Sequence, residues 1–135
     1  MNISYPRCPL IYLIESNNSF KIGYSSNLDN RLKSYYTMCP NAKILAVAFF
    51  NTKDSRKLEK TIRDLVKYDV NGKTISQEWF EGCTTAAVKK SFNRVADCAE
   101  DCDIIINITK HGNLKFVKGH FNLFFEKKLE DLILY

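Results

Sequence analysis

Hydrophobic and polar positions follow a hairpin pattern between residues 10 and 25. Two apolar stretches, at 10–14 and 20–23, flank a polar run at 15–19. This pattern predicts a β-hairpin with Asn17-Asn18 at its tip, because asparagine tolerates the left-handed backbone of such turns. That turn aligns three facing pairs along the two strands: Ser16 with Ser19, Ile14 with Lys21, and Tyr12 with Gly23.

Alternation along the strands sorts their side chains between two faces. One face is apolar and is the expected core: Ile11, Leu13 and Ile22. The other face gathers a phenol, an ammonium and a bare glycine backbone beside one isoleucine: Tyr12, Lys21, Gly23 and Ile14. A face of this composition is typical of a phosphate-binding site.

Helical and extended patterns alternate along the rest of the chain. They predict six elements, in chain order: a helix from Ser26 or Asn27 to about 36, a strand at 43–50, a helix at 55–68 capped by Asp54, a helix from 84 or 85 to about 98, a hairpin at 103–109 and 114–118, and a helix at 121–135. The helical stripes expected to face the core are Leu28, Leu32, Tyr35 and Tyr36; Leu58, Ile62, Leu65 and Val66; Val88, Phe92 and Val95; and Phe125, Leu129, Leu132 and Ile133.

These elements predict an α/β fold of the α+β type, with a small three-stranded antiparallel sheet flanked by helices. The first hairpin and the strand at 43–50 supply the three strands. Residues 1–82 form the predicted core domain, and residues 83–135 form an extension of helix, hairpin and helix packed on that core. Asn71-Gly72 marks a turn, and a short connector leads from it to Glu78-Trp79-Phe80.

Charge is unevenly distributed along the 135 residues, whose net charge is +5. Residues 1–82 hold 12 basic and 8 acidic side chains, and residues 83–135 hold 8 and 7. The cationic excess therefore lies in the segment with the polar hairpin face. It favours a polyanionic partner, although many soluble proteins carry a similar excess.

Cysteine usage and hydropathy predict an intracellular protein. The five cysteines are odd in number and lack a framework spacing, which predicts reduced thiols. The longest apolar run, at 44–50, is far shorter than the ~20 residues that a membrane-spanning helix needs. No signal peptide is visible at the amino terminus. We expect no membrane partner, and a location in the cytoplasm, or in the cytoplasm or nucleus of a host cell if the protein is viral.

Five short motifs, taken in order, resemble the GIY-YIG endonuclease superfamily. They are Ile11-Tyr12, Lys21-Ile22-Gly23, Ser25-x-Asn27-Leu28, Arg31-Leu32 and Glu78-Trp79-Phe80. The likeness is greatest to the branch of phages and large DNA viruses, whose second signature reads KIG and whose later segment reads EWF. It extends over roughly residues 9–82.

The resemblance implies phosphodiester hydrolysis with a single divalent ion, Mg²⁺ or Mn²⁺, on a helix glutamate. Glu59 stands in that place, although its alternative use is a helix ion pair with Arg63. Tyr12 matches the phenol near the attacking water, and Arg31 matches the arginine that binds the phosphate. Lys21 matches the lysine of the KIG branch. The alternatives for these three are a half-buried strand tyrosine, a solvated helix charge and an exposed strand lysine.

Several positions depart from the superfamily pattern. Leu10 replaces a glycine, while Tyr35 and Arg63 stand where relatives carry histidines. The general base is therefore left open between Tyr12, Tyr35 and a metal-bound hydroxide. Glu78 is either a second acidic group at the site or a partner that holds Arg31 or Arg63.

Gly23 and Ser25 complete the predicted substrate-binding set, with Arg63 and Glu78. Gly23 would let a substrate backbone approach closely or would permit a bend at the strand end.

Two weaker signals lie near the carboxyl terminus. Cysteines and histidines there include zinc-ligand types without a usual spacing: Cys98, Cys102, His111 and His120. Residues 115–121 interleave basic and aromatic side chains, as some nucleic-acid surfaces do.

The sequence therefore predicts a metal-dependent endonuclease that acts on double-stranded or branched DNA. Two alternatives stay open: a catalytically inactive module that binds nucleic acid, and a protein-interaction domain. In the last case, the extension at 83–135 would form a homodimer or partner surface.

Overall fold

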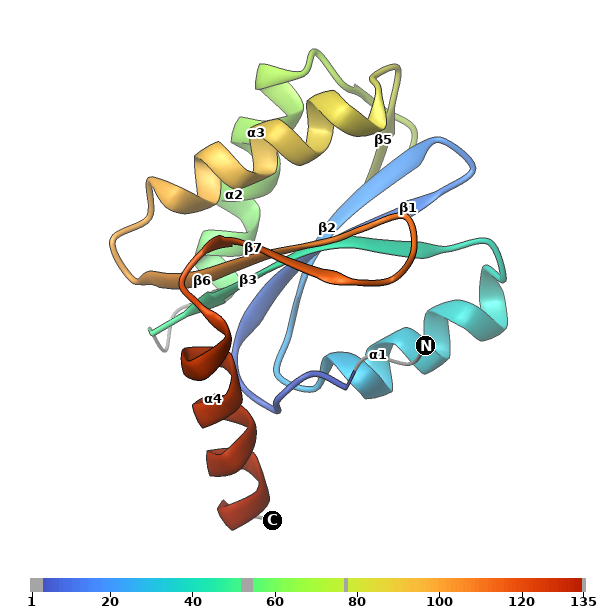
Figure 1. Ribbon diagram of the computed structural model, residues 1–135. Coiled ribbons are helices and arrows are strands. Elements are labelled where there is room, and N and C mark those ends of the chain that lie inside the picture. Colours follow the sequence, from blue (N-terminus) through green and yellow to red (C-terminus); the bar gives the residue numbers. More distant parts are fainter. Residues whose placement is uncertain (1–3, 52–54, 77, 135) are drawn as a thin grey trace.

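A seven-stranded antiparallel sheet organises the protein (Figure 1). The structure is a computed structural model that describes residues 4–51, 55–76 and 78–134; the side chains of residue 55 and of residues 131–134 are outside that description. The strands lie in the order β4-β5-β2-β1-β3-β6-β7. Their bounds are β1 Leu10–Ser16, β2 Ser19–Ser25, β3 Lys43–Phe50, β4 Lys73–Thr74, β5 Trp79–Glu81, β6 Cys102–Ile108 and β7 Leu114–Lys118.

The predicted central hairpin is confirmed, with its turn and its register. Asn17 and Asn18 have positive φ angles of 51° and 65°, the left-handed conformation that a tight hairpin turn requires. Three facing pairs of β1 and β2 have the predicted partners: Ser16 with Ser19, Ile14 with Lys21, and Tyr12 with Gly23.

The sheet is covered by helices on both faces (Figure 1). Helices α2 (Ser55–Asp69) and α3 (Thr85–Asp97) pack on one face, where Ile62 and Phe92 join the core. Helices α1 (Leu28–Met38) and α4 (Phe121–Leu134) pack on the other, through residues that include Leu32 and Phe124. The prediction of a core on one hairpin face alone is therefore wrong, because Tyr12 and its face are buried under α1.

The α+β class is confirmed, but the predicted three-stranded sheet is wrong in its extent. At one edge, β5 pairs with β2 and β4 pairs with β5. At the other edge, β6 pairs with β3, so the C-terminal hairpin continues the same sheet. Two- and three-residue strands such as β4 and β5 are too short to show an alternating pattern, which explains why the sequence did not predict them.

Helix caps agree with the sequence where they are described. The Asn27 side chain accepts a hydrogen bond from the Asn30 N–H, and the Thr84 side chain accepts one from the Ala87 N–H. These contacts satisfy backbone donors in the first turns of α1 and α3. The predicted Asp54 cap lies outside the described residues.

Three predicted helical stripes need correction. In α1, Tyr36 is 44% exposed, whereas Leu28 and Leu32 are buried. In α2, Leu65 is 50% exposed, whereas Ile62 and Val66 are buried. In α4, Phe124 is buried between Phe49 and Phe116, while the predicted Phe125 and Leu129 are exposed. The remaining predicted α4 positions, Leu132 and Ile133, have no described side chains. No disulfide joins any of the five cysteines, all of which lie within the described residues. Among the described residues, no helix is long and apolar enough to cross a bilayer.

Candidate functional site

The candidate site is built on the facing pair Tyr12 and Gly23. Tyr12 is 1% exposed, and its hydroxyl lies 3.0 Å from that of Tyr35 on α1. The two rings meet edge to face, with centroids 6.1 Å apart. A Cβ added at Gly23 would lie 2.4 Å from the Tyr12 hydroxyl oxygen. Gly23 therefore makes room for the phenol, and the substrate contact predicted for its backbone stays untested.

Lys21 reaches the same place from β2. Its ammonium lies 2.6 Å from a Glu78 carboxylate oxygen and 5.1 Å from the centre of the Tyr35 ring. Burial by itself lowers the pKa of Lys21, but contacts with Glu78 and Tyr35 outweigh it and raise that pKa. The Lys21 contact lowers the pKa of Glu78, with smaller contributions from Arg63 and Arg31. The pair is therefore charged at neutral pH.

Glu78 forms its ion pair with Lys21, not with Arg31 or Arg63, the partners that the sequence suggested. Sequence reasoning did not identify the pair with Lys21, because residues 21 and 78 meet only through the pairing of β2 with β5. In that pairing Lys21 lies opposite Trp79, next to Glu78. Treating the Glu78-Trp79-Phe80 segment as a strand beside β2 would have brought the two charges together.

Arg31, Glu59 and Arg63 complete the charged surroundings. Arg31 on α1 is exposed, lies one helical turn from Tyr35, and acts electrostatically on both Tyr12 and Glu78. Glu59 and Arg63 form an i,i+4 pair on α2 whose closest atoms are 3.9 Å apart. Glu59 also acts on Tyr12. The structure thus brings the predicted site residues of β1, β2, α1 and α2 into one electrostatic neighbourhood.

The Tyr12 phenol is held in its neutral form. Burial is the largest cause of its raised pKa, followed by the hydrogen bond with Tyr35, and Arg31 opposes the shift. A phenol with a raised pKa keeps its proton at neutral pH, so almost no phenolate is present to act as a base. Tyr12 is therefore suited to donating a hydrogen bond rather than to acting as a base.

The residues present fit a divalent ion held by one carboxylate. The Glu59 side chain is 22% exposed and its ion pair with Arg63 is long, so its oxygens are open to a further ligand. Mg²⁺ commonly takes one or two carboxylates and completes its shell with water and phosphate oxygens. Among the described residues, no group of three or more His, Cys, Asp or Glu side chains is arranged to hold a metal.

Ser25 has a local role at the end of β2. Its side chain is buried, and its hydroxyl accepts a hydrogen bond from the Asn27 N–H, just before α1 begins. That bond helps to set the turn that carries α1, and with it Arg31, over the hairpin. The weaker zinc alternative gains no support, because its two cysteines and two histidines do not come together as a metal-holding group among the described residues.

The fold and the cluster define an antiparallel α+β domain with a polar site at its central hairpin and first helix. The T5orf172 domain family matches residues 10–96, and the chain belongs to this family. This membership supports a nuclease-like domain of the phage and viral kind.

One relative gives this membership a viral context. The chain is 31% identical over 93 residues to the putative KilA-N domain-containing protein 315L of Invertebrate iridescent virus 6. The aligned part covers 67% of this chain and 38% of that protein, so the chain spans well under half the relative's length. No solved structure matches the chain.

Proposed function

We propose that the protein is a metal-dependent DNA endonuclease of the GIY-YIG type. The observation that carries the proposal is the convergence of Tyr12, Lys21 and Tyr35 in direct contact, with Arg31 and Glu59 in electrostatic range. A phenol donor, two cations and one carboxylate are the groups that hydrolysis of a phosphodiester uses. The family membership and the viral relative are consistent with DNA as the partner.

Each residue has a distinct part in the proposed reaction. The exposed Arg31 guanidinium binds the scissile phosphate and neutralises charge that develops on its oxygens. Lys21 adds a second positive charge. The buried Tyr12 hydroxyl donates to the Tyr35 hydroxyl and so orients the Tyr35 hydroxyl toward the phosphate. Glu59 holds Mg²⁺ or Mn²⁺, which when bound supplies Lewis-acid polarisation and a more acidic water. Glu78 keeps Lys21 in place and charged.

Nicking of supercoiled plasmid with Mg²⁺ or Mn²⁺ tests the proposal. Arg31→Gln and Glu59→Gln should each lower the rate about a hundredfold or more, the scale seen when one transition-state contact is removed. Lys90→Gln and Asp64→Asn are matched controls, because both residues are exposed on α3 and α2. They should nick at the wild-type rate. Equal loss in the controls, or full activity in Glu59→Gln, would contradict the proposed roles.

A second candidate is a DNA-binding module that does not cleave. It is favoured by the state of the cluster, where Tyr12 is held neutral and Lys21 is already paired with Glu78. A module of this kind would retard plasmid DNA at low salt and release it as salt rises, with no nicking in either metal. Retardation without nicking would therefore replace the endonuclease proposal by this one.

A further inference from the structure

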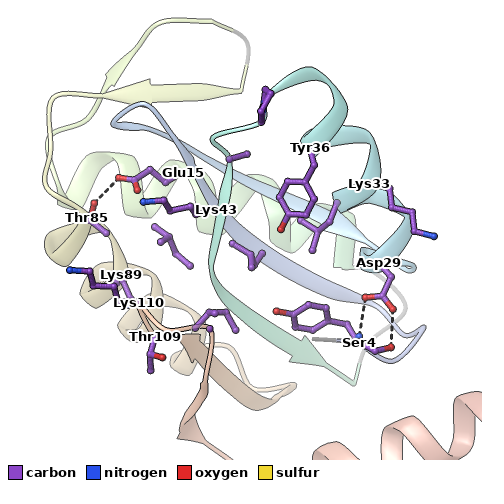
Figure 2. A pocket seen from close by; sticks show the side chains of 18 residues that line it. Ser4, Glu15, Asp29, Lys33, Tyr36, Lys43, Thr85, Lys89, Thr109 and Lys110 are labelled. Carbon is purple, nitrogen blue, oxygen red and sulfur yellow. Dashed lines mark hydrogen bonds between the residues drawn. The ribbon is translucent and has the colours of Figure 1, made fainter. Parts of the chain in front are cut away.

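A cavity of about 930 Å³ lies on the opposite flank of α1 from the candidate site. Arg31 and Tyr35 point from one flank of the helix, whereas Asp29, Lys33 and Tyr36 line the cavity from the other. Further walls come from the segment before β1, from strands β1 and β3, from the start of α3 and from the β6–β7 turn (Figure 2). Its volume falls within the range of small-ligand sites, about 300–1,000 Å³.

Four lysines from four different elements surround this cavity. They are Lys33 of α1, Lys43 of β3, Lys89 of α3 and Lys110 of the β6–β7 turn. None of their ammonium groups forms an ion pair with a described residue. Lysines gathered from separate elements cannot be explained as the solvated face of one helix, and together they create a positive potential in a concave surface.

The two carboxylates in the walls are already engaged. Glu15 accepts a hydrogen bond from the Thr85 hydroxyl at 2.7 Å. Asp29 accepts hydrogen bonds from the Ser4 hydroxyl at 3.1 Å and from the Tyr5 N–H at 3.0 Å (Figure 2). These donors are neutral, so both carboxylates keep their charge, and the four lysines against the two acids leave the lining with a net charge of +2.

Aromatic side chains give the cavity a second property. Tyr36 is 44% exposed, although its position in α1 predicted a place in the core. Tyr5 also lines the wall and is 3% exposed, and its hydroxyl is buried without a hydrogen-bond partner among the described residues. An unsatisfied buried hydroxyl calls for a partner such as a water or a ligand atom.

We propose that this cavity binds a single-stranded segment of nucleic acid, with lysines on its phosphates and a base against Tyr36. Cationic grooves with exposed aromatic rings bind single strands in this way, because every base has a face that stacks. An unstacked strand can offer both a phosphate and a free base face to such a surface, whereas the bases of a duplex are stacked and paired in its interior. The inference rests on the proposed function only in taking nucleic acid as the partner. It would direct cleavage toward DNA with an unpaired strand next to the candidate site.

Fluorescence anisotropy with a short labelled oligothymidylate in EDTA tests this proposal. The triple variant Lys43→Gln, Lys89→Gln and Lys110→Gln should bind about tenfold or more weakly, and its salt slope should fall by about 2, since each single-strand phosphate contact contributes about 0.7. The matched control, Lys60→Gln with Lys73→Gln and Lys90→Gln, removes the same charge at exposed positions outside the cavity. It should keep most of the affinity.

Stacking is tested separately on the same probe. Tyr36→Leu should weaken binding about tenfold, as loss of one stacked base does. Tyr68→Leu alters a tyrosine that is 87% exposed on α2 and should have no effect. Equal losses in the two triple variants would overturn the proposal by showing that total charge alone sets the affinity.

Two further outcomes distinguish this proposal from a free-nucleotide site and from the endonuclease proposal. Lysine-dependent binding of a labelled nucleoside monophosphate, with no binding of the oligonucleotide, would overturn it in favour of a free-nucleotide site. Plasmid nicking is measured independently, since the binding assay contains no divalent metal. Absent nicking with lysine-dependent oligonucleotide binding would remove the endonuclease proposal and support this one. Nicking with oligonucleotide binding that ignores the cavity lysines would do the reverse.

Discussion

Gly23 and Tyr12 show how one missing side chain shapes the candidate site. They face each other across the central hairpin, and the Tyr12 ring covers the glycine. Because the ring packs on the bare Gly23 backbone, the Tyr12 phenol lies close to the sheet. In that position its hydroxyl is 3.0 Å from the Tyr35 hydroxyl. A glycine at this position is therefore required by packing, whatever else it offers to a substrate.

Substitution Gly23→Ala should move the phenol and destabilise the fold. The new Cβ would lie 2.4 Å from the Tyr12 hydroxyl oxygen and 2.5 Å from the ring carbon that bears it, both too close for contact. Because the ring is buried, we expect a loss of about 1–3 kcal/mol in the free energy of unfolding, as for other overpacked sites. Urea titration measures that loss, and nicking activity should fall with it.

A double variant separates the clash from any general effect on strand β2. Tyr12→Leu removes the aromatic ring, so Gly23→Ala should cost clearly less in that background than in the wild type. Equal costs in both backgrounds would show that the alanine acts through the backbone and not through Tyr12.

At the scale of elements, local signals predicted most of the fold correctly. The positive φ angles of Asn17 and Asn18 and the Asn27 and Thr84 caps involve neighbours within a few residues, and local pattern is enough to find them. The α4 stripe failed for a different reason. Its sequence is apolar on more than one side, and contact with Phe49 on a distant strand decides that Phe124 turns inward.

The Lys21–Glu78 pair links the central hairpin to β5 and should be measurable as a coupling energy. Glu78 is about half exposed, so Glu78→Gln should cost about 1 kcal/mol or less in the free energy of unfolding. A double-mutant cycle with Lys21→Met isolates the interaction. Glu81→Gln, at an exposed carboxylate at the end of β5, is the control and should show no coupling to Lys21.

The sign of the pH dependence follows from the two shifts. The pKa of Glu78 is lowered, so its contribution is present above the ordinary value of 4.5 and is lost as pH falls below it. The pKa of Lys21 is raised, so its contribution is present below 10.5 and is lost at higher pH. The coupling should therefore be constant between these values and vanish in acid. A coupling that persists at low pH would contradict an ionic interaction.

At the scale of the whole molecule, the sequence predicted those parts of the candidate site whose residues lie close together in the chain. Tyr12, Lys21, Arg31 and Tyr35 lie on one hairpin and the helix after it, and their proximity follows from local structure. The Lys21–Glu78 contact and the lysine-lined cavity depend on pairing between distant strands and on the path of α1 across the sheet. Neither leaves a periodic signal, because each element contributes one or two residues.

The core on both faces of the sheet bears on the predicted domain boundary after Gly82. Helix α3 and strand β6 supply part of the core that α2 shares, including Phe92 and Ile105. On the other face, Ile106 and Phe124 complete the core that α1 shares. A chain of residues 1–82 would leave these contacts unmade and would expose the long edge of β3, which pairs with β6 in the intact protein.

We therefore expect residues 1–82 alone to aggregate or to lack a cooperative urea transition, whereas the full chain should unfold cooperatively. Phe124→Ala in the full chain is the graded comparison, since it removes one buried ring and should cost about 3–5 kcal/mol while leaving the sheet complete. Circular dichroism and urea titration of the three proteins distinguish the cases. A cooperative transition in residues 1–82 would show that the N-terminal part is an independent domain, and that β6 and β7 merely extend its sheet. The expected failure would instead make α3, the C-terminal hairpin and α4 part of one folding unit with the candidate site, because β3 needs a partner on each side to hold the hairpin that carries Tyr12 and Lys21.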